Sequence, residues 1–164
     1  MNVKKLLFLL LLFSFISLVS KAQVPANDNP CNATPLTVGT SCVYVNATNV
    51  NATNSAGVPA PGCANYSGAD VWFSAVVPAN GVILLDANTG TMNNGAMAAY
   101  SGTCGSLTLI SCNNNGSANG QMPALTIKGA CPAISLYCSI VWPGRALSCL
   151  DSNSVELILI CDFT

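Results

Sequence analysis

The feature that most constrains this chain is a succession of short apolar or alternating runs separated by turn-forming residues. No part of residues 23–164 repeats apolar positions at the 3.6-residue period of a helix. Several short strands with Gly, Asn and Pro turns between them are typical of a sandwich or barrel. We therefore predict an all-β fold, an antiparallel β-sandwich resembling a jelly roll, with eight or nine short strands. The predicted strands are 36–38, 42–45, 71–77, 82–87, 97–100, 107–112, 124–127, 134–142 and 155–161.

Alternation within two of these runs supports the prediction. In the 134–142 run, apolar residues such as Leu136 and Cys138 fall on one face, and Ser139 falls on the other. A period of two residues is that of a half-buried strand. In the 155–161 run, apolar residues stand on both faces, so we expect that strand to be covered on both sides.

Residues 1–22 are predicted to be a secretory signal peptide rather than part of the fold. Two lysines precede an apolar run over 6–19, and small residues around Ala22 form the cleavage site. The run is shorter than the ~20 residues that a membrane-spanning helix needs, although a retained anchor is the alternative. Residues 23–30 are predicted to be a flexible entry arm, and 31–164 to be the sandwich domain. The predicted location is therefore secreted or at the cell surface, with no stable membrane span.

Charged side chains are scarce in this chain, and histidine is absent. Removal of the signal peptide leaves two basic and six acidic side chains, a net charge of −4. This balance excludes a basic patch of the kind that binds nucleic acid. Without histidine, the chain lacks the usual general base, the usual member of a catalytic triad and the commonest zinc ligand. The composition therefore predicts a protein that is not an enzyme and has no nucleic-acid partner.

Nine cysteines behind a signal peptide indicate disulfide bonds, because exported proteins fold in an oxidising compartment. Cys104 and Cys112 flank a short turn and a strand, a spacing that suits a disulfide bond stapling a hairpin. Sequence alone leaves the other pairings open. Since nine is odd, at least one thiol stays unpaired or links two chains in a disulfide-linked oligomer. Cys138 is predicted to be a buried free thiol rather than a nucleophile, since no histidine is present to activate it.

Five segments occur in an order that resembles a known class of exported modules. They are 27–33 (NDNPCNA), 52–55 (ATNS), 70–73 (DVWF), 97–107 (MAAYSGTCGSL) and 110–112 (ISC). Together they are similar to secreted β-sandwich modules, CUB-like or related to pre-peptidase C-terminal domains, of cell-surface and type IX-exported proteins. The resemblance implies a non-catalytic appendage, and some modules of this kind bind carbohydrate, protein or calcium.

Two asparagine clusters stand where modules of this class often carry acidic residues. Residues 93–94 precede the Met-Ala-x-Tyr strand, and 113–115 follow the second cysteine of the hairpin. Calcium prefers several carboxylate oxygens, and neutral amides lower both the charge and the affinity of a site. The sequence therefore predicts no metal and no cofactor.

Two residues are candidates for ligand binding. Trp142 stands at a predicted strand end, where an exposed ring can stack on a sugar. Asp70 precedes a predicted strand and is a candidate for contact with a ligand or ion, the alternative being that it hydrogen-bonds a turn. A pairing of Asp70 with Asp86 as the acid and base of a hydrolase has no support from the spacing.

The sequence thus predicts a secreted, non-catalytic binding or adhesion module at the cell surface, whose partner is an extracellular carbohydrate or protein. Exposed loops at 46–61 and 113–121 are the predicted contact segments. The other strand aromatics, Trp72, Tyr100 and Tyr137, are expected in the core rather than on a sugar-binding platform. The alternatives are a structural surface subunit cross-linked by a disulfide bond and, with less support, a carboxylate-based hydrolase.

Overall fold

The computed structural model describes residues 23–40, 43–129 and 135–141 and, for 154–161, the course of the backbone. Trp142 and the predicted signal peptide lie outside these ranges, as do Cys42, Cys131 and Cys149. Within the described part of the chain, no helix has the length and apolar character to cross a bilayer.

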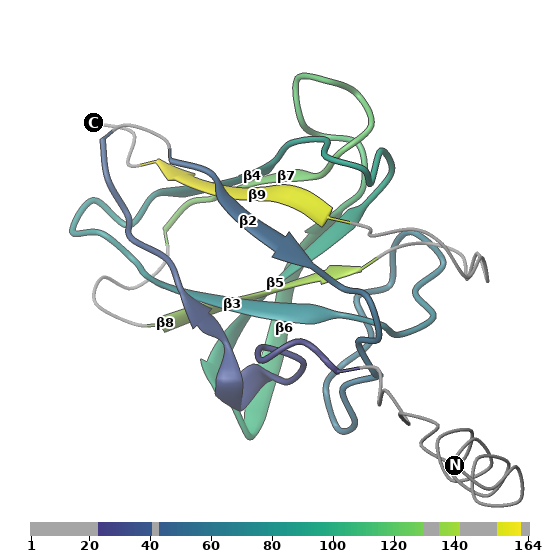
Figure 1. Cartoon of the computed structure of the whole chain (residues 1–164). Coiled ribbons are helices and arrows are strands. Elements are labelled where there is room, and N and C mark those ends of the chain that lie inside the picture. Colours follow the sequence, from purple (N-terminus) through teal and green to yellow (C-terminus); the bar gives the residue numbers. More distant parts are fainter. Residues whose placement is uncertain (1–22, 41–42, 130–134, 142–153, 162–164) are drawn as a thin grey trace, which may run out of the picture.

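The described residues form two β-sheets that pack face to face (Figure 1). A single-turn 3₁₀-helix, η1 (Pro30–Asn32), precedes the strands. These are β1 (Thr34–Pro35), β2 (Val45–Thr48), β3 (Val71–Val76), β4 (Ile83–Ala87), β5 (Ala96–Thr103), β6 (Ser106–Asn113), β7 (Ala124–Ile127), β8 (Ser135–Val141) and β9 (Ser154–Cys161). One sheet has the order β1-β3-β8-β5-β6, and the other has the order β2-β9-β4-β7.

The strands from β2 onwards pair as one long hairpin that is rolled up. β5 pairs with β6, β4 with β7, β3 with β8 and β2 with β9, and every pair is antiparallel. Successive pairs of this nested series lie alternately in the two sheets. This connectivity is that of a jelly roll, so the predicted antiparallel β-sandwich of jelly-roll type is confirmed. The two-residue β1 adds to it by parallel pairing with β3.

The main hydrophobic core lies between the two sheets. In β4, the buried Ile83, Leu85 and Ala87 alternate with the half-exposed Leu84 and Asp86, the period of a strand with one face on a core. In β8 the predicted face of Leu136, Cys138 and Ile140 is buried, but Ser139 on the opposite face is buried too, at 1% exposure. The largest buried side chains of this core include Phe73, Ile83, Leu85, Met92, Met97, Met122, Leu136 and Ile140.

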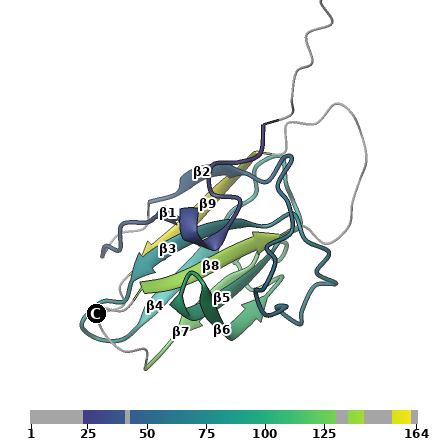
Figure 2. The ribbon, with the colours of Figure 1, turned by 90° about the horizontal axis from the view of Figure 1, so that it is seen from below.

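The strand β5 departs from this half-buried pattern. Its first five residues, 96–100, are all buried, so both faces of the strand are covered. The outer face carries a second apolar cluster of Trp72, Ala98, Tyr100 and Leu107. Ala33, directly after η1, and Val58, from the loop between β2 and β3, pack against this cluster. Figure 2 shows how η1 and this loop run beside the five-stranded sheet. This covered outer face positions the candidate site.

The predicted bounds of the first two strands are wrong. Residues 36–38 are not a strand, although Leu36 and Val38 pack against the core and the Leu36 amide donates to the Ser74 carbonyl at 2.8 Å. The strand predicted at 42–45 is instead β2, which begins at Val45. Apolar residues at the edge of a sheet can pack on the core without forming the hydrogen-bond ladder of a strand. A short apolar run in the sequence looks the same whether it forms a strand or not.

Candidate functional site

The segment between β2 and β3, residues 49–70, is a long irregular loop packed over the outer face of the five-stranded sheet. Val58 of this loop packs against the cluster that contains Trp72 and Tyr100. The two rings lie 5.4 Å apart, centroid to centroid, and both are essentially inaccessible to solvent. Their predicted place in the core is confirmed. Long loops without secondary structure in a compact domain are commonly functional, since a rigid scaffold positions their side chains.

A chain of hydrogen bonds ties the middle of the loop to the sheet. The indole N–H of Trp72 donates to Ser55 Oγ at 2.7 Å, and the Ser55 backbone amide donates to Asp70 Oδ1 at 3.3 Å. The hydroxyl of Tyr66 lies 3.2 Å from the same Asp70 oxygen and 2.9 Å from Asn54 Oδ1. Buried polar groups need such partners, because an unmatched one loses its hydration without compensation.

Asp70 is therefore a structural residue of this loop. Its side chain is 1% exposed, and Oδ1 accepts hydrogen bonds from the loop itself. Its Oδ2 atom is also buried and has no hydrogen-bond partner among the described residues. The bonds to Oδ1 support the alternative that Asp70 hydrogen-bonds a turn before the strand, and its contact with a ligand stays a prediction. Burial, together with the negative charge of Asp70, raises the pKa of Tyr66 above its ordinary value, so this hydroxyl keeps its proton.

The segment preceding the domain is fastened to the same place. Asp28 accepts two hydrogen bonds of 2.6 Å from Thr53, one from its amide and one from its hydroxyl. Asn27 exchanges hydrogen bonds with Trp72: its side-chain amide donates to the Trp72 carbonyl at 2.9 Å, and its own carbonyl accepts from the Trp72 amide at 2.8 Å. Residues 23–30 were predicted to be a flexible arm, yet their second half is bonded to the sandwich.

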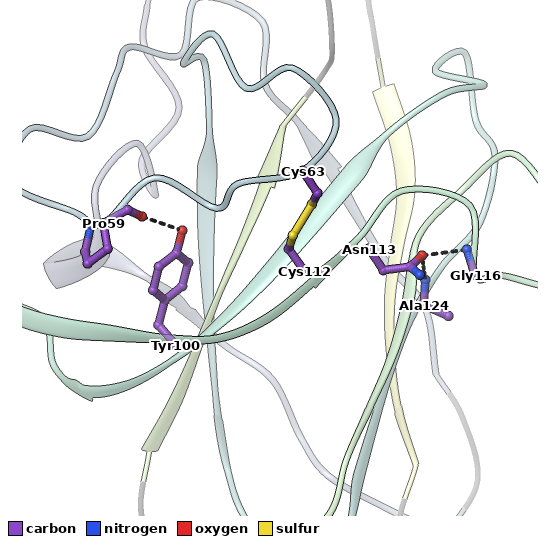
Figure 3. The surroundings of a disulfide bond; sticks show 7 residues. All are labelled: Pro59, Cys63, Tyr100, Cys112, Asn113, Gly116 and Ala124. Carbon is purple, nitrogen blue, oxygen red and sulfur yellow. Dashed lines mark hydrogen bonds between the residues drawn. A yellow bond between two sulfur atoms is a disulfide. The ribbon is translucent and has the colours of Figure 1, made fainter.

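Two disulfide bonds complete the attachment. Cys63 of the loop is bonded to Cys112 near the end of β6, with their Cα atoms 6.3 Å apart. Cys31 in η1 is bonded to Cys104 in the turn between β5 and β6, with a Cα separation of 4.9 Å. These bonds hold η1 and the loop against the β5–β6 hairpin. Figure 3 shows the bond between Cys63 and Cys112.

The predicted disulfide bond between Cys104 and Cys112 is therefore wrong, although the hairpin itself exists. Cys104 lies in the turn, whereas Cys112 stands opposite Ala98 towards the far end of the hairpin. The eight residues of β6 lie between the turn and that end, and extended chain of this length covers about 25 Å. A disulfide bond joins Cα atoms only a few ångströms apart, so each cysteine pairs with a different segment of the chain.

The hydroxyl of Tyr100 forms a further link to the loop, because it donates to the Pro59 carbonyl at 3.0 Å (Figure 3). Burial raises the pKa of Tyr100 to about 12, and the negative charge of Asp70 adds to the rise. The neutral hydroxyl is the form that donates this hydrogen bond, and a low-dielectric site disfavours its anion.

Stability is accordingly expected to fall in alkali. The ordinary pKa of tyrosine is 10.0, so above that pH the unfolded chain releases the Tyr100 proton first. The stabilisation is complete below pH 10 and is lost as the pH rises to about 12. Urea unfolding across this range measures the effect. The Tyr100→Phe variant should show a shallower decline than the wild type. Equal slopes in the two proteins would contradict the role of Tyr100.

The second contact loop, predicted at 113–121, runs in the structure over 113–122. It begins at Asn113, the last residue of β6, directly after the disulfide-bonded Cys112. Its first residue organises it: Asn113 Oδ1 accepts from the Gly116 amide at 2.5 Å and from the Ala124 amide at 3.3 Å (Figure 3). At its other end, Asn119 Oδ1 accepts from the Met122 amide at 2.9 Å. Asparagine side chains commonly stabilise turns in this way. The disulfide bond therefore connects the 49–70 loop, at a cysteine just beyond the predicted contact segment 46–61, to the root of the second loop.

The surface that the two loops present is uncharged and polar. Asn65 and Ser67 of the first loop and Asn114 and Asn115 of the second are exposed. The first loop also forms a shallow hollow of about 290 Å³ beside the disulfide bond. Its lining residues are Ala60, Gly62, Cys63, Ala64, Asn65 and Tyr66. Amide and hydroxyl groups on a fixed backbone are suited to hydrogen bonding with a neutral ligand.

The remaining predicted residues do not join this surface. Asp86 lies in β4 of the other sheet, accepts a hydrogen bond from the Tyr44 hydroxyl at 3.2 Å and shares no bonding partner with Asp70. The described contacts therefore do not assemble the two carboxyl groups into a hydrolase pair. Cys138 is free and 2% exposed, which confirms the prediction of a buried thiol. Burial raises the pKa of this thiol. Trp142 lies outside the described residues.

The part of the chain that the structure describes holds no group of three or more Asp, Glu, Cys or His side chains arranged to bind a metal ion. No family model, curated protein or solved structure matches the chain. The likeness to CUB-like and pre-peptidase C-terminal modules consequently rests on the sequence segments alone. Three of those segments, 27–33, 52–55 and 70–73, meet in the hydrogen-bonded network around Trp72.

Proposed function

We propose that this chain is an exported, non-catalytic binding module that contacts an extracellular ligand through the 49–70 and 113–122 loops. The disulfide bond between Cys63 and Cys112 carries the proposal, because it joins the first loop to the root of the second. Loops fixed before binding lose little conformational entropy when a ligand arrives. A disulfide-bonded β-sandwich is also compatible with an extracellular protein.

The chemistry of the loop surface favours a neutral carbohydrate over a charged ligand. Its exposed side chains include Asn65, Ser67, Asn114 and Asn115, which offer amide and hydroxyl groups to the hydroxyl groups of a sugar. The carboxylate of the loop that lies nearest, Asp70, is buried and already accepts hydrogen bonds. A protein ligand that recognises the same polar surface is the alternative outcome of a binding screen.

A panel of immobilised neutral glycans, acidic glycans and matrix proteins tests the proposal, with and without calcium. We expect binding to at least one neutral glycan, unchanged by calcium. Binding only to matrix proteins would reassign the ligand class, and binding only in calcium would contradict the metal-free site. If the protein binds none of the immobilised ligands, the proposed function is contradicted.

Oligomeric state separates the module from the structural alternative. A cross-linked surface subunit requires a disulfide bond between chains, and nine cysteines leave at least one without a partner in the same chain. Among the described residues, the free cysteine is the buried Cys138, which a second chain does not reach. A covalent dimer or ladder on non-reducing gels would favour the structural subunit over the binding module.

A further inference from the structure

Four asparagines in this chain are followed directly by glycine, at 80–81, 94–95, 115–116 and 119–120. In such a pair, the backbone nitrogen of glycine can attack the side-chain carbonyl carbon of asparagine. Glycine lacks a Cβ, so nothing shields its nitrogen. The four pairs share this local chemistry, and any difference in their reactivity in the folded protein must come from the structure.

Three of the four glycine nitrogens are held by hydrogen bonds. An amide that donates to a carbonyl must break that bond and turn before it can attack a side chain. The Gly81 amide donates to the Pro78 carbonyl at 3.0 Å, the Gly116 amide to Asn113 Oδ1 at 2.5 Å, and the Gly120 amide to the Ser117 carbonyl at 2.9 Å.

Two of these pairs are held at the asparagine side chain as well. Asn80 Oδ1 accepts from the Val82 amide at 2.9 Å. Asn119 Oδ1 accepts from the amides of Gln121 and Met122, both at 2.9 Å. A side-chain carbonyl that is fixed in this way points towards its donors rather than towards the following glycine nitrogen.

Within the part of the chain that the structure describes, the pair at 94–95 has neither hydrogen-bond restraint, although Gly95 itself is buried. Asn94 is exposed, and no hydrogen bond joins its side chain or the Gly95 amide to another described residue. We propose that Asn94 is a site of spontaneous deamidation in the folded protein. This inference goes beyond the proposed binding function and does not depend on it.

The reaction needs water and no other reactant. The Gly95 nitrogen bonds to Cγ of Asn94, the amide C–N bond breaks, and ammonia leaves with the Gly95 proton. Water then opens the cyclic imide at either carbonyl, which yields aspartate or isoaspartate. Both products add a negative charge, and isoaspartate also lengthens the backbone by one CH₂ group.

The location gives this change a structural consequence. A Cβ placed at Gly95 would lie 3.2 Å from Met122 Cε and 3.3 Å from Met92 Sδ, so the backbone there is closely packed. Met122 ends the 113–122 loop, and its amide is bonded to Asn119. Modification at Asn94 therefore places charge and backbone strain beside one of the two proposed contact loops.

Peptide mapping of the folded protein after incubation in ¹⁸O-water tests the proposal, because imide hydrolysis incorporates the label. A single hydrogen bond changes a rate by about fivefold. We therefore expect label at Asn94 at a rate about fivefold or more above that at each of the other three sites. Faster labelling at any of those three would overturn the proposal.

The reduced chain in denaturant is the control for local sequence. There the four sites should react at similar rates, since no fold restrains them. The same preference for Asn94 in the denatured chain would overturn the structural explanation. The Asn94→Gln variant should lose the fast-labelling site, whereas the matched Asn115→Gln variant should keep it.

Discussion

Replacing Trp72 with alanine is expected to lower the free energy of unfolding by about 3–5 kcal/mol, the usual cost of truncating a large buried aromatic residue. Trp72 is 0% exposed and lies at the centre of the second apolar cluster. Its removal leaves a cavity against Tyr100 and deprives Ser55 of its indole donor. Because Ser55 links the loop to Asp70, the loss should loosen residues 49–70 as well as the sheet.

Urea unfolding of Trp72→Ala and Trp72→Phe measures this effect and divides it into packing and hydrogen bonding. The phenylalanine variant keeps most of the buried ring but removes the 2.7 Å hydrogen bond to Ser55. Its expected cost is about 1–3 kcal/mol, because the buried Ser55 oxygen loses its donor, while the Ser55 hydroxyl keeps the Asp28 carbonyl as its acceptor at 3.5 Å. A loss below about 1 kcal/mol for Trp72→Ala would show that the cluster under the loop is not packed as described.

Removal of the Cys63–Cys112 bond, as Cys63→Ala with Cys112→Ala, is expected to have the second large effect. The bond closes a sequence separation of 49 residues. The chain-entropy treatment of such a cross-link gives a loss of up to about 4 kcal/mol, of which about 2–4 is typically observed. Locally, the 49–70 loop should lose protection from hydrogen exchange, because its middle is then held only by hydrogen bonds and by the packing of Val58.

Cys138→Ala is the matched control for this pair of substitutions. It also removes a sulfur atom from the protein but leaves both disulfide bonds intact. Its expected cost is about 1 kcal/mol, with no change in exchange of the loop. If the double variant were no less stable than this control, with equal protection of the loop, the disulfide bond would not be what fixes the site.

The architecture could be read from the sequence because its signal is repeated along the whole chain. The alternation in 134–142 predicted the buried face of β8, which carries Leu136 and Cys138 into the core. In β5 the same reasoning could not succeed. Residues 96–100 are buried on both faces, since a loop distant in sequence covers the outer one.

The repeated pentapeptide of the chain shows the limit of local prediction. Residues 45–49 and 50–54 are identical (VNATN), yet only the first copy forms a strand. The first copy pairs with β9, and the second lies in the loop, where Asn51 adopts a positive φ of 63° and Thr53 binds Asp28. Tertiary partners rather than intrinsic preference decide between the two conformations.

The candidate site was predicted in part. The loops at 46–61 and 113–121 were expected from their turn-rich composition, and most of each lies within the observed loops. Their connection was missed, because cysteine spacing does not determine pairing and the hairpin offered a nearer partner. The sequence does not indicate that Ser55 and Tyr66 bond to Asp70, apart from their short distance from it along the chain. A polar residue in a loop looks the same in a sequence whether or not its side chain forms a hydrogen bond.

The central claim is that the surface shared by the two loops binds a neutral extracellular ligand. The most direct test is the dissociation constant of a glycan retained in the screen, measured for the wild type and for Asn65→Ala combined with Asn114→Ala. Both residues are exposed, so stability should not change. Thr126→Ala, exposed on β7 of the opposite sheet, is the control. We predict that the loop variant weakens binding by about tenfold or more, the loss of roughly one good hydrogen bond, and that the control leaves it unchanged. Equal affinity of the loop variant and the wild type, or weakening by Thr126→Ala alone, would contradict the account.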